Sequence, residues 1–154
     1  QLEIIKIIRK YQPEVVLANA IKDRHPDHGR ASKLISDACF YSGLIKIETE
    51  LEGVKQDKWR PKAVYHYIQD RFLKPDFVVD VTPFVDQKIE AIKCFSSQFF
   101  DPNSTEPQTP ISGEQFFDFI KGRMMQFGRE IGVDYAEGFT AERYIGVEDI
   151  MGLV

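Results

Sequence analysis

Apolar positions in the first third of the chain alternate between helical and strand spacing. The chain opens on a helical pattern that is predicted to end at about Tyr11, because Pro13 disfavours helical geometry in the residue before it. Residues 14–19 carry apolar side chains on both faces, which is typical of a buried parallel strand rather than an edge strand. Helical spacing resumes at Arg30 and ends at Gly43, a residue type that often closes helices.

The rest of the chain continues this alternation. After a charged, irregular segment at 44–61, the pattern predicts strands at 63–68 and 77–81, a helix begun by Thr82 and Pro83, and a long helix that follows a capping box at 112–115. Alternating helices and strands predict an α/β fold, here a Rossmann-like layered sheet, mostly parallel, with flanking helices. No internal repeat or linker interrupts the sequence, so residues 1–154 are predicted to form a single domain.

Composition narrows the classes of partner. The 20 Lys and Arg residues against 24 Asp and Glu residues give a net charge of −4, without a basic stripe that would neutralise phosphates, which argues against nucleic-acid binding. No apolar run is long enough to cross a membrane, so a membrane partner is not expected. Cys39 and Cys94 lie in helical patterns without CxxC spacing. Both are therefore predicted to be buried free thiols in a reducing compartment, the cytoplasm.

The candidate chemistry lies in the polar segment 20–29, directly after the first predicted strand. This segment contains two of the three histidines, His25 and His28, with carboxylates on both sides. Ligands of open α/β sheets bind beyond the carboxyl ends of the strands, and neutral imidazole is a common zinc ligand. One interpretation is a zinc site; the other is a polar loop in which Asp27 caps a helix and the histidines are solvated. The pair alone does not complete a catalytic zinc site, which needs about three protein ligands.

These residues also carry a family resemblance. The stretch 16–19, followed by Asp23-Arg24-His25-Pro26-Asp27-His28, resembles the LmbE-like (PIG-L) zinc deacetylase superfamily. Further similarity, to the bacterial branch that deacetylates N-acetylglucosaminyl malate in bacillithiol synthesis, lies at 65–68, at 74–77 with Asp80, at 97–99 and at 135–139. The resemblance implies a zinc-dependent hydrolase that releases acetate from a small-molecule N-acetyl sugar.

The resemblance assigns roles to individual residues. His28 matches a zinc ligand of the family, and His25 matches the histidine that stabilises the oxyanion or protonates the leaving amine. Asp27 is expected either to hold His25 in its charged form or to cap the helix. Arg24 is expected to bind a substrate carboxylate, although an arginine beside a turn is often a surface ion-pair partner. In the family, the other zinc ligands and the general base come from an N-terminal His-Pro-Asp-Asp segment, which this sequence lacks.

This gap favours the interpretation that the sequence is the C-terminal portion of a longer deacetylase domain, without its N-terminal strands. A second hypothesis is a non-catalytic remnant or assembly partner that lacks half of the metal site. A third, a metal-free hydrolase that uses His25 and Asp27 with a nucleophile, is disfavoured because no Ser or Cys lies in a nucleophile elbow. Family relatives form homo-oligomers, often hexamers, and the excursions at 44–59 and 99–111 are candidate contact surfaces.

Overall fold

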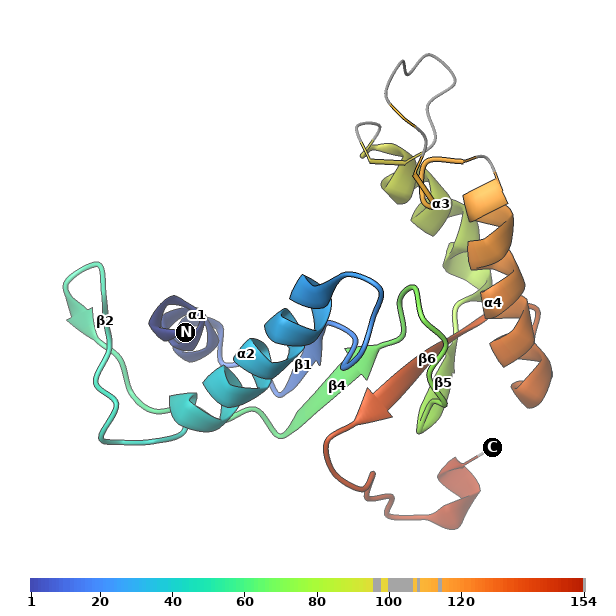
Figure 1. The fold of residues 1–154 in the computed structure, drawn as a ribbon. Coiled ribbons are helices and arrows are strands. Elements are labelled where there is room, and N and C mark those ends of the chain that lie inside the picture. Colours follow the sequence, from blue (N-terminus) through green and yellow to red (C-terminus); the bar gives the residue numbers. More distant parts are fainter. Residues whose placement is uncertain (96–97, 100–106, 108, 114, 154) are drawn as a thin grey trace. The chain divides into compact units, whose positions relative to one another are not determined.

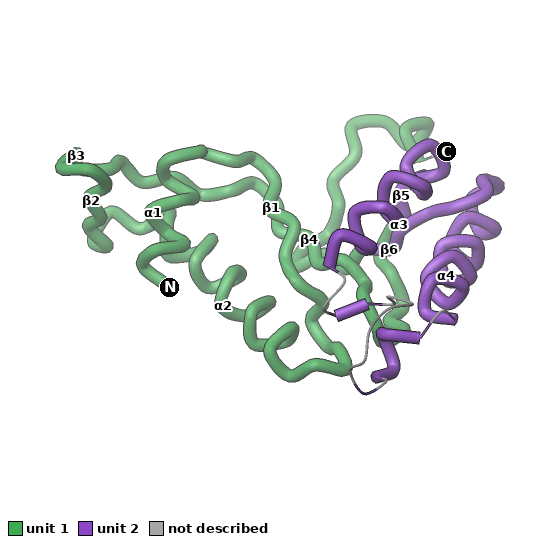
Figure 2. The backbone as a smooth tube through the Cα atoms, turned by 90° about the horizontal axis from the view of Figure 1, so that it is seen from above, with its two compact units in different colours: residues 1–77, 139–154 green, residues 78–138 purple. Residues whose placement is uncertain are grey.

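The structure is a computed structural model of the chain, and it describes residues 1–95, 98–99, 107, 109–113 and 115–153 (Figure 1). These residues form two compact units (Figure 2): unit 1 is Gln1–Phe77 with Phe139–Val154, and unit 2 is Val78–Gly138. The single-domain organisation stays a prediction. Within the described ranges, no helix combines the length and the apolar character needed to cross a membrane. Ser97 and most of the excursion at 99–111 lie outside the described residues.

Four strands form one mixed sheet, in the order β1-β4-β6-β5. They are β1 (Val15–Ala18), β4 (Ala63–Tyr67), β5 (Phe77–Asp80) and β6 (Ala136–Ala141). β1 and β4 are parallel, whereas β4 and β6 are antiparallel. The α/β class is confirmed, but the prediction of a mostly parallel sheet is wrong, because β6 inserts between β4 and β5 and runs opposite to β4.

β6 is the strand of this sheet that the hydrophobic pattern does not predict. Glu137 and Gly138 interrupt its apolar positions, and both residue types are depleted in strands. Four of its six residues are nevertheless buried. Its place between two other strands explains this, because neighbours on both edges satisfy its backbone N–H and C=O groups.

β1 lies at an edge of this sheet, so the expectation that it is not an edge strand is wrong for the described chain. Its direction is parallel to β4, as the pattern predicts. However, Val15 is 50% exposed and Leu17 is 58% exposed, because β4 is the one strand among those described that pairs with β1. The apolar pattern therefore predicted the strand and its direction but not its environment.

The core of unit 1 forms where two helices pack on each other and the second of them packs on β1 and β4 (Figure 1). These helices are α1 (Leu2–Tyr11) and α2 (Pro26–Ser42). Ile5 and Ile8 of α1 pack against Ala38 and Cys39 of α2. α1 ends as predicted, since Gln12 turns into the left-handed region with φ of 48° before Pro13.

Unit 2 contains a short 3-10 helix, η1 (Thr82–Phe84), followed by α3 (Val85–Lys93) and α4 (Gln115–Ile131). Val85 and Ile89 of α3 pack against Met124 of α4 to form its core. The predicted helix at 82 thus begins as a 3-10 turn. Thr82 is not its cap, because the Thr82 hydroxyl forms hydrogen bonds with the backbone of Tyr135.

Unit 1 also contains two short elements outside the main sheet. The segment at 44–61, predicted to be irregular, includes an antiparallel hairpin of β2 (Glu50–Leu51) and β3 (Val54–Lys55). Its two turn residues have positive φ, 54° at Glu52 and 79° at Gly53, which is the conformation of a type I′ turn. A short 3-10 helix, η2 (Ile150–Gly152), lies near the end of the chain.

A buried arginine holds the segment that follows α2. The Arg9 guanidinium donates hydrogen bonds of 2.7 to 3.1 Å to the carbonyl oxygens of Ser42, Leu44 and Ile47 and to Thr49 Oγ1. The fork of guanidinium N–H groups suits several acceptors at once. Arg9 therefore ties residues 42–49 to α1.

Replacing Arg9 with Met is expected to lower the free energy of unfolding by about 3 kcal/mol, because buried acceptors left without a donor each cost about 1–3 kcal/mol. The matched control is Lys10→Met, an exposed position on the same helix, with an expected change within about 0.5 kcal/mol. Urea unfolding followed by circular dichroism measures both. An Arg9→Met loss no larger than that of the control would contradict the role assigned to Arg9.

The two cysteines occupy different environments. Cys39 is buried, as predicted. Cys94 is exposed, so the prediction of a buried thiol is wrong there. The reason is that α3 ends at Lys93, and Cys94 caps the helix instead of extending its core-facing side.

Iodoacetamide at pH 8 is therefore expected to alkylate Cys94 at least about 100-fold faster than Cys39, because only the thiolate reacts. Burial, with a smaller contribution from the negative charge of Glu142, raises the pKa of Cys39 to about 11. Labelling of Cys39 should accelerate as the pH rises and on unfolding in urea. Timed labelling with peptide mass spectrometry gives both rates, and equal rates in the folded protein would contradict the prediction.

Candidate active site

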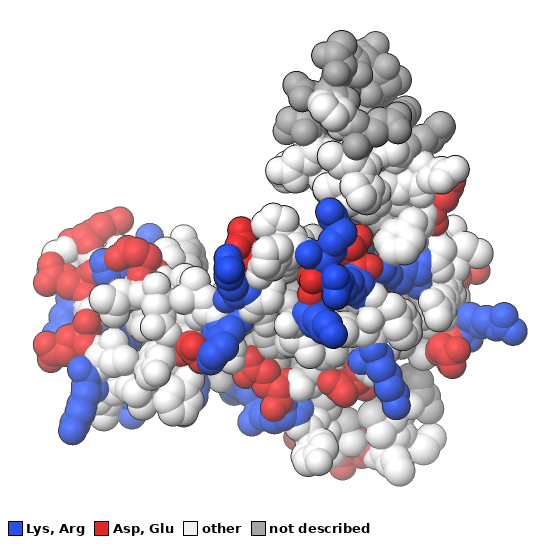
Figure 3. Space-filling view, in the orientation of Figure 1, with Lys and Arg blue, Asp and Glu red and all other residues white. Residues whose placement is uncertain are grey.

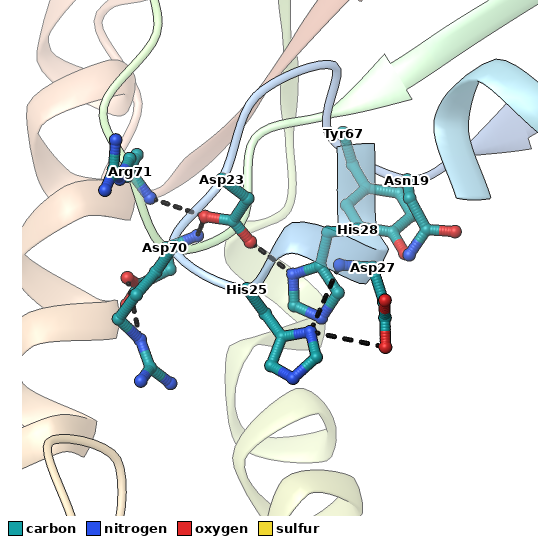
Figure 4. A network of polar contacts seen from close by, with 9 residues as sticks. Asn19, Asp23, His25, Asp27, His28, Tyr67, Asp70 and Arg71 are labelled. Carbon is teal, nitrogen blue, oxygen red and sulfur yellow. Dashed lines mark hydrogen bonds and ion pairs between the residues drawn. The ribbon is translucent and has the colours of Figure 1, made fainter. Parts of the chain in front are cut away.

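The loop between β1 and α2 brings the candidate residues together (Figure 4). α2 begins at Pro26, earlier than Arg30, where the spacing predicts it, and His25 is its N-cap. Proline suits the first helical position, since its φ is already helical and its missing N–H is not needed there. The early start places Asp27 and His28 on the first turn of α2, beyond the carboxyl end of β1.

A buried carboxylate fixes the ring of His28. The Asp23 side chain is 0% exposed, and its Oδ2 lies 2.5 Å from His28 Nδ1 (Figure 4). The other oxygen, Oδ1, accepts hydrogen bonds from the backbone N–H groups of Asp70 and Arg71, at 3.1 and 2.9 Å. Because an ionised carboxylate only accepts, the proton of the neutral His28 ring lies on Nδ1, and Nε2 then has a lone pair. His28 is thus held in the tautomer that can bind a ligand through Nε2.

The charge of Asp23 is maintained by its partners. Burial alone would raise its pKa, but the hydrogen bond from His28 and those from the backbone N–H groups of Arg71, Arg24 and Asp70 together outweigh it. The pKa of Asp23 therefore lies below its usual value. At neutral pH the group is a carboxylate, the form that orients His28.

His25 has the opposite arrangement of ring nitrogens. Its Nδ1 accepts a hydrogen bond of 3.2 Å from the Asp27 N–H and so caps α2. In the neutral ring the proton then lies on Nε2. The His25 and His28 ring centroids are 5.4 Å apart. The pair therefore combines a lone pair, on His28, with an N–H donor, on His25.

Asp27 lies beside His25 without a hydrogen bond between their side chains. Asp27 Oδ2 is 3.7 Å from His25 Nδ1, and Oδ1 accepts a 3.1 Å bond from Arg30. Since the cap is His25, the alternative in which Asp27 caps the helix is wrong. Protonation of His25 Nδ1 would end its bond from the Asp27 N–H and favour a closer contact with the Asp27 carboxylate. That Asp27 holds His25 in its charged form stays a prediction.

Arg24 forms an ion pair at the edge of this loop. Its Nε lies 3.3 Å from Asp70 Oδ2, and both side chains are partly exposed. This is the surface pairing that the sequence offers as the alternative to substrate binding. Because the guanidinium has further N–H groups, a carboxylate of a ligand has donors left to bind, and the substrate role of Arg24 stays a prediction.

Asn19 and Tyr67, to which the sequence assigns no chemical role, also belong to this region (Figure 4). Asn19 Nδ2 donates a 2.8 Å hydrogen bond to the Tyr67 hydroxyl. Burial and, second, the charge of Asp23 raise the pKa of Tyr67, so its hydroxyl keeps its proton at neutral pH. The available signal for Asn19 was its position, a polar residue directly after a strand. Nothing local indicated its partner.

The residues present fit one position of a metal site. A histidine ligand usually donates its second ring N–H to a carboxylate or carbonyl, and His28 has this arrangement with Asp23. In the part of the chain that the structure describes, no group of three or more His, Cys, Asp or Glu side chains is placed to hold a metal ion. His28 therefore fits as one ligand, and the described residues do not complete a catalytic zinc set.

Comparison with known proteins finds relatives among sugar deacetylases, although no protein-family model matches the chain. The diacetylchitobiose deacetylase of Thermococcus kodakarensis is 27% identical over 139 residues, which are 88% of this chain and 48% of that protein. The chain thus spans about half the length of this curated relative.

Two solved structures share the fold and some of the sequence. The conserved protein TT1542 of Thermus thermophilus matches with a TM-score of 0.77 and 28% identity, over 96% of this chain and 60% of that one. The N,N′-diacetylchitobiose deacetylase of Pyrococcus horikoshii, solved with an inhibitor, matches with a TM-score of 0.71 and 25% identity, over 99% of this chain and 55% of that one. The chain is therefore distantly related to N-acetyl-sugar deacetylases, which is the relationship that its LmbE-like resemblance predicts.

Proposed function

We propose that the protein hydrolyses the N-acetyl amide of an N-acetylglucosaminyl substrate with the help of bound zinc and releases acetate. The observation that carries this proposal is the histidine pair, in which buried Asp23 leaves Nε2 of His28 free to bind a metal ion. The distant relationship to sugar deacetylases supports the same class of reaction. The remaining zinc ligands and the general base are proposed to come from sequence outside these 154 residues.

His28 and His25 would have different roles in this reaction. Zinc, when bound, polarises a carbonyl and lowers the pKa of a water molecule. His28 would bind the metal ion through Nε2, with its tautomer fixed by Asp23. His25 would donate its Nε2–H to the oxygen that becomes negative as water adds to the amide, a contribution of about 100- to 1,000-fold in kcat for one such donor. A protonated His25, favoured by Asp27, would then supply the proton that the leaving amine needs.

Within this class we propose N-acetylglucosaminyl malate as the substrate, the compound deacetylated in bacillithiol synthesis. Arg24 would bind its malate carboxylate in competition with Asp70. Figure 3 shows acidic side chains beside the basic ones on one face of the molecule, so that this face offers nucleic acid no uniformly basic surface. We further propose that the protein works in the cytoplasm as a homo-oligomer, with a hexamer as the form to test.

The test uses the full product of the gene, purified and reconstituted with zinc. Acetate release is measured on N-acetylglucosaminyl malate, on N-acetylglucosamine and on diacetylchitobiose, with metal-stripped protein as the control. We expect release that depends on zinc and is fastest with the malate compound. Zinc-loaded protein that releases no acetate from any of the three would contradict the proposed reaction. Faster turnover of diacetylchitobiose would contradict the proposed substrate alone.

A further inference from the structure

His66, on β4, is the centre of a buried polar network that the proposed reaction does not use. The residue is 3% exposed. Its Nδ1 lies 2.8 Å from the Asn19 carbonyl oxygen and 2.9 Å from Ser32 Oγ, and its Nε2 lies 3.0 Å from Glu142 Oε1. Both ring nitrogens therefore face oxygen atoms from other elements of unit 1.

The order Ser32, His66, Glu142 matches that of a nucleophile, a base and an acid, but the geometry does not activate the serine. A carbonyl oxygen only accepts hydrogen bonds, so His66 Nδ1 carries a proton and donates it toward Asn19. A nitrogen that already carries a proton cannot remove one from the Ser32 hydroxyl. Ser32 is itself buried. The network therefore holds structure in place and does not form a catalytic triad.

The partner of the second ring nitrogen, Nε2, bears on the charge of His66. A carboxylate of Glu142 can only accept, so beside it Nε2 would be a donor as well as Nδ1. With two N–H donors the ring of His66 would be an imidazolium ion. Glu142, which is partly exposed, supplies the opposite charge at 3.0 Å, and such a partner is what makes a buried cation tolerable.

His66 contacts the backbone of the residue that directly follows β1. The ladder between β1 and β4 ends with Ala18 opposite His66, so Asn19 is the first residue beyond it. His66 donates to the Asn19 carbonyl, and the next residue, Tyr67, accepts from the Asn19 side-chain amide. Consecutive strand residues point to opposite faces of a sheet. Asn19 is thus fixed by its backbone and by its side chain, at the point where the loop to the histidine pair begins.

We propose that His66, as an imidazolium ion paired with Glu142, is a positioning residue that fixes Asn19 and, through it, the loop that carries His25 and His28. The expected effect of His66 on turnover rests on the proposed function. The protonation of His66 and the order of the loop can be measured without it.

The first test is NMR spectroscopy of the ¹⁵N-labelled full product of the gene at pH 7. Both ring nitrogens of His66 are expected to show the chemical shifts of protonated imidazolium, and loss of the signals in His66→Gln assigns them. In Glu142→Gln, which keeps an acceptor but removes the charge, Nε2 is expected to lose its proton. A non-protonated ring nitrogen in the unsubstituted protein would overturn the proposal.

The second test compares two variants that each keep half of the ring's donors. The amide of His66→Asn lies where Nδ1 was and can still donate to Asn19, whereas the amide of His66→Gln lies nearer the place of Nε2. We expect kcat within about threefold of the unsubstituted protein for Asn and about tenfold lower for Gln, with KM unchanged, because small displacements of catalytic groups are costly. Equal kcat values at equal melting temperature would overturn the proposal.

Hydrogen exchange separates this result from the proposed function. If the unsubstituted protein releases no acetate, the proposed function fails, and the same two variants are compared by exchange of the backbone N–H groups of residues 20–28. Faster exchange in His66→Gln than in His66→Asn supports the positioning role. Equal exchange in the two variants overturns it.

Discussion

Replacing His28 with Ala in the full product of the gene is expected to lower its affinity for zinc by more than about 100-fold. Substitution of a residue that only orients a metal ligand already lowers metal affinity by about 10- to 100-fold, and here the ligand itself is removed. The substitution removes Nε2, the one ring nitrogen of His28 that Asp23 leaves free. Competition with a chromophoric zinc chelator measures the affinity, and elemental analysis gives the metal content of the purified protein.

Two further variants define what the loss means. Asp23→Asn keeps the imidazole but removes the charge that orients it, and is expected to weaken zinc binding by about 10- to 100-fold. Lys22→Ala, at an exposed position of the same loop, should leave the affinity unchanged. Stoichiometric zinc in His28→Ala, bound as tightly as in the unsubstituted protein, would show that His28 is not a ligand.

The elements that follow from local chemistry are the ones that the sequence predicts. The end of α1 is an example, because a left-handed Gln12 and then Pro13 stop the helix whatever surrounds it. The start of α2 is predicted too late, because its first turn carries no large hydrophobic side chain from which helical periodicity could be recognised. Pro26, which suits the first helical position, was the better local signal there.

The arrangement of the sheet depends on contacts that are distant in sequence. β6 contains a charged residue and a glycine, so its pattern alone does not indicate a strand, and burial between β4 and β5 decides the matter. The same dependence explains why the sheet is mixed. The sheet becomes mixed because β6 pairs with β4 in the opposite direction. The spacing of apolar residues within 136–141 does not indicate which strands β6 pairs with.

The residues of the candidate site also differ in whether local features of the sequence predict them. His25 and His28 lie together at the start of α2 and were predicted as a pair, because their spacing and their place after a strand are local features. The buried Asp23 that orients His28 is held by the backbone of Asp70 and Arg71, far along the chain. The hydrogen bonds of Asn19 to β4 are equally distant in sequence. Sequence analysis therefore found the reactive groups and the carboxylates beside them, but not the distant contacts that hold Asp23 and Asn19 in place.

His25→Ala is expected to lower kcat by about 100-fold or more while the zinc content stays unchanged, because His25 is proposed to donate to the oxyanion and not to bind the metal ion. Steady-state kinetics of acetate release, with zinc measured on the same samples, separates the two histidines. Loss of zinc together with activity would show that His25 is a ligand.

His25 is also the N-cap of α2, so its removal has a structural effect that must be separated from catalysis. Ala lacks a side-chain acceptor, and loss of a cap typically costs about 1 kcal/mol of stability. Asn is among the best N-cap residues, so His25→Asn should restore the stability without restoring an imidazole. We therefore expect kcat to fall equally in both variants, while the melting temperature falls only in His25→Ala. Recovery of kcat in His25→Asn would mean that capping the helix, and not donation from the ring, is what His25 contributes to the reaction.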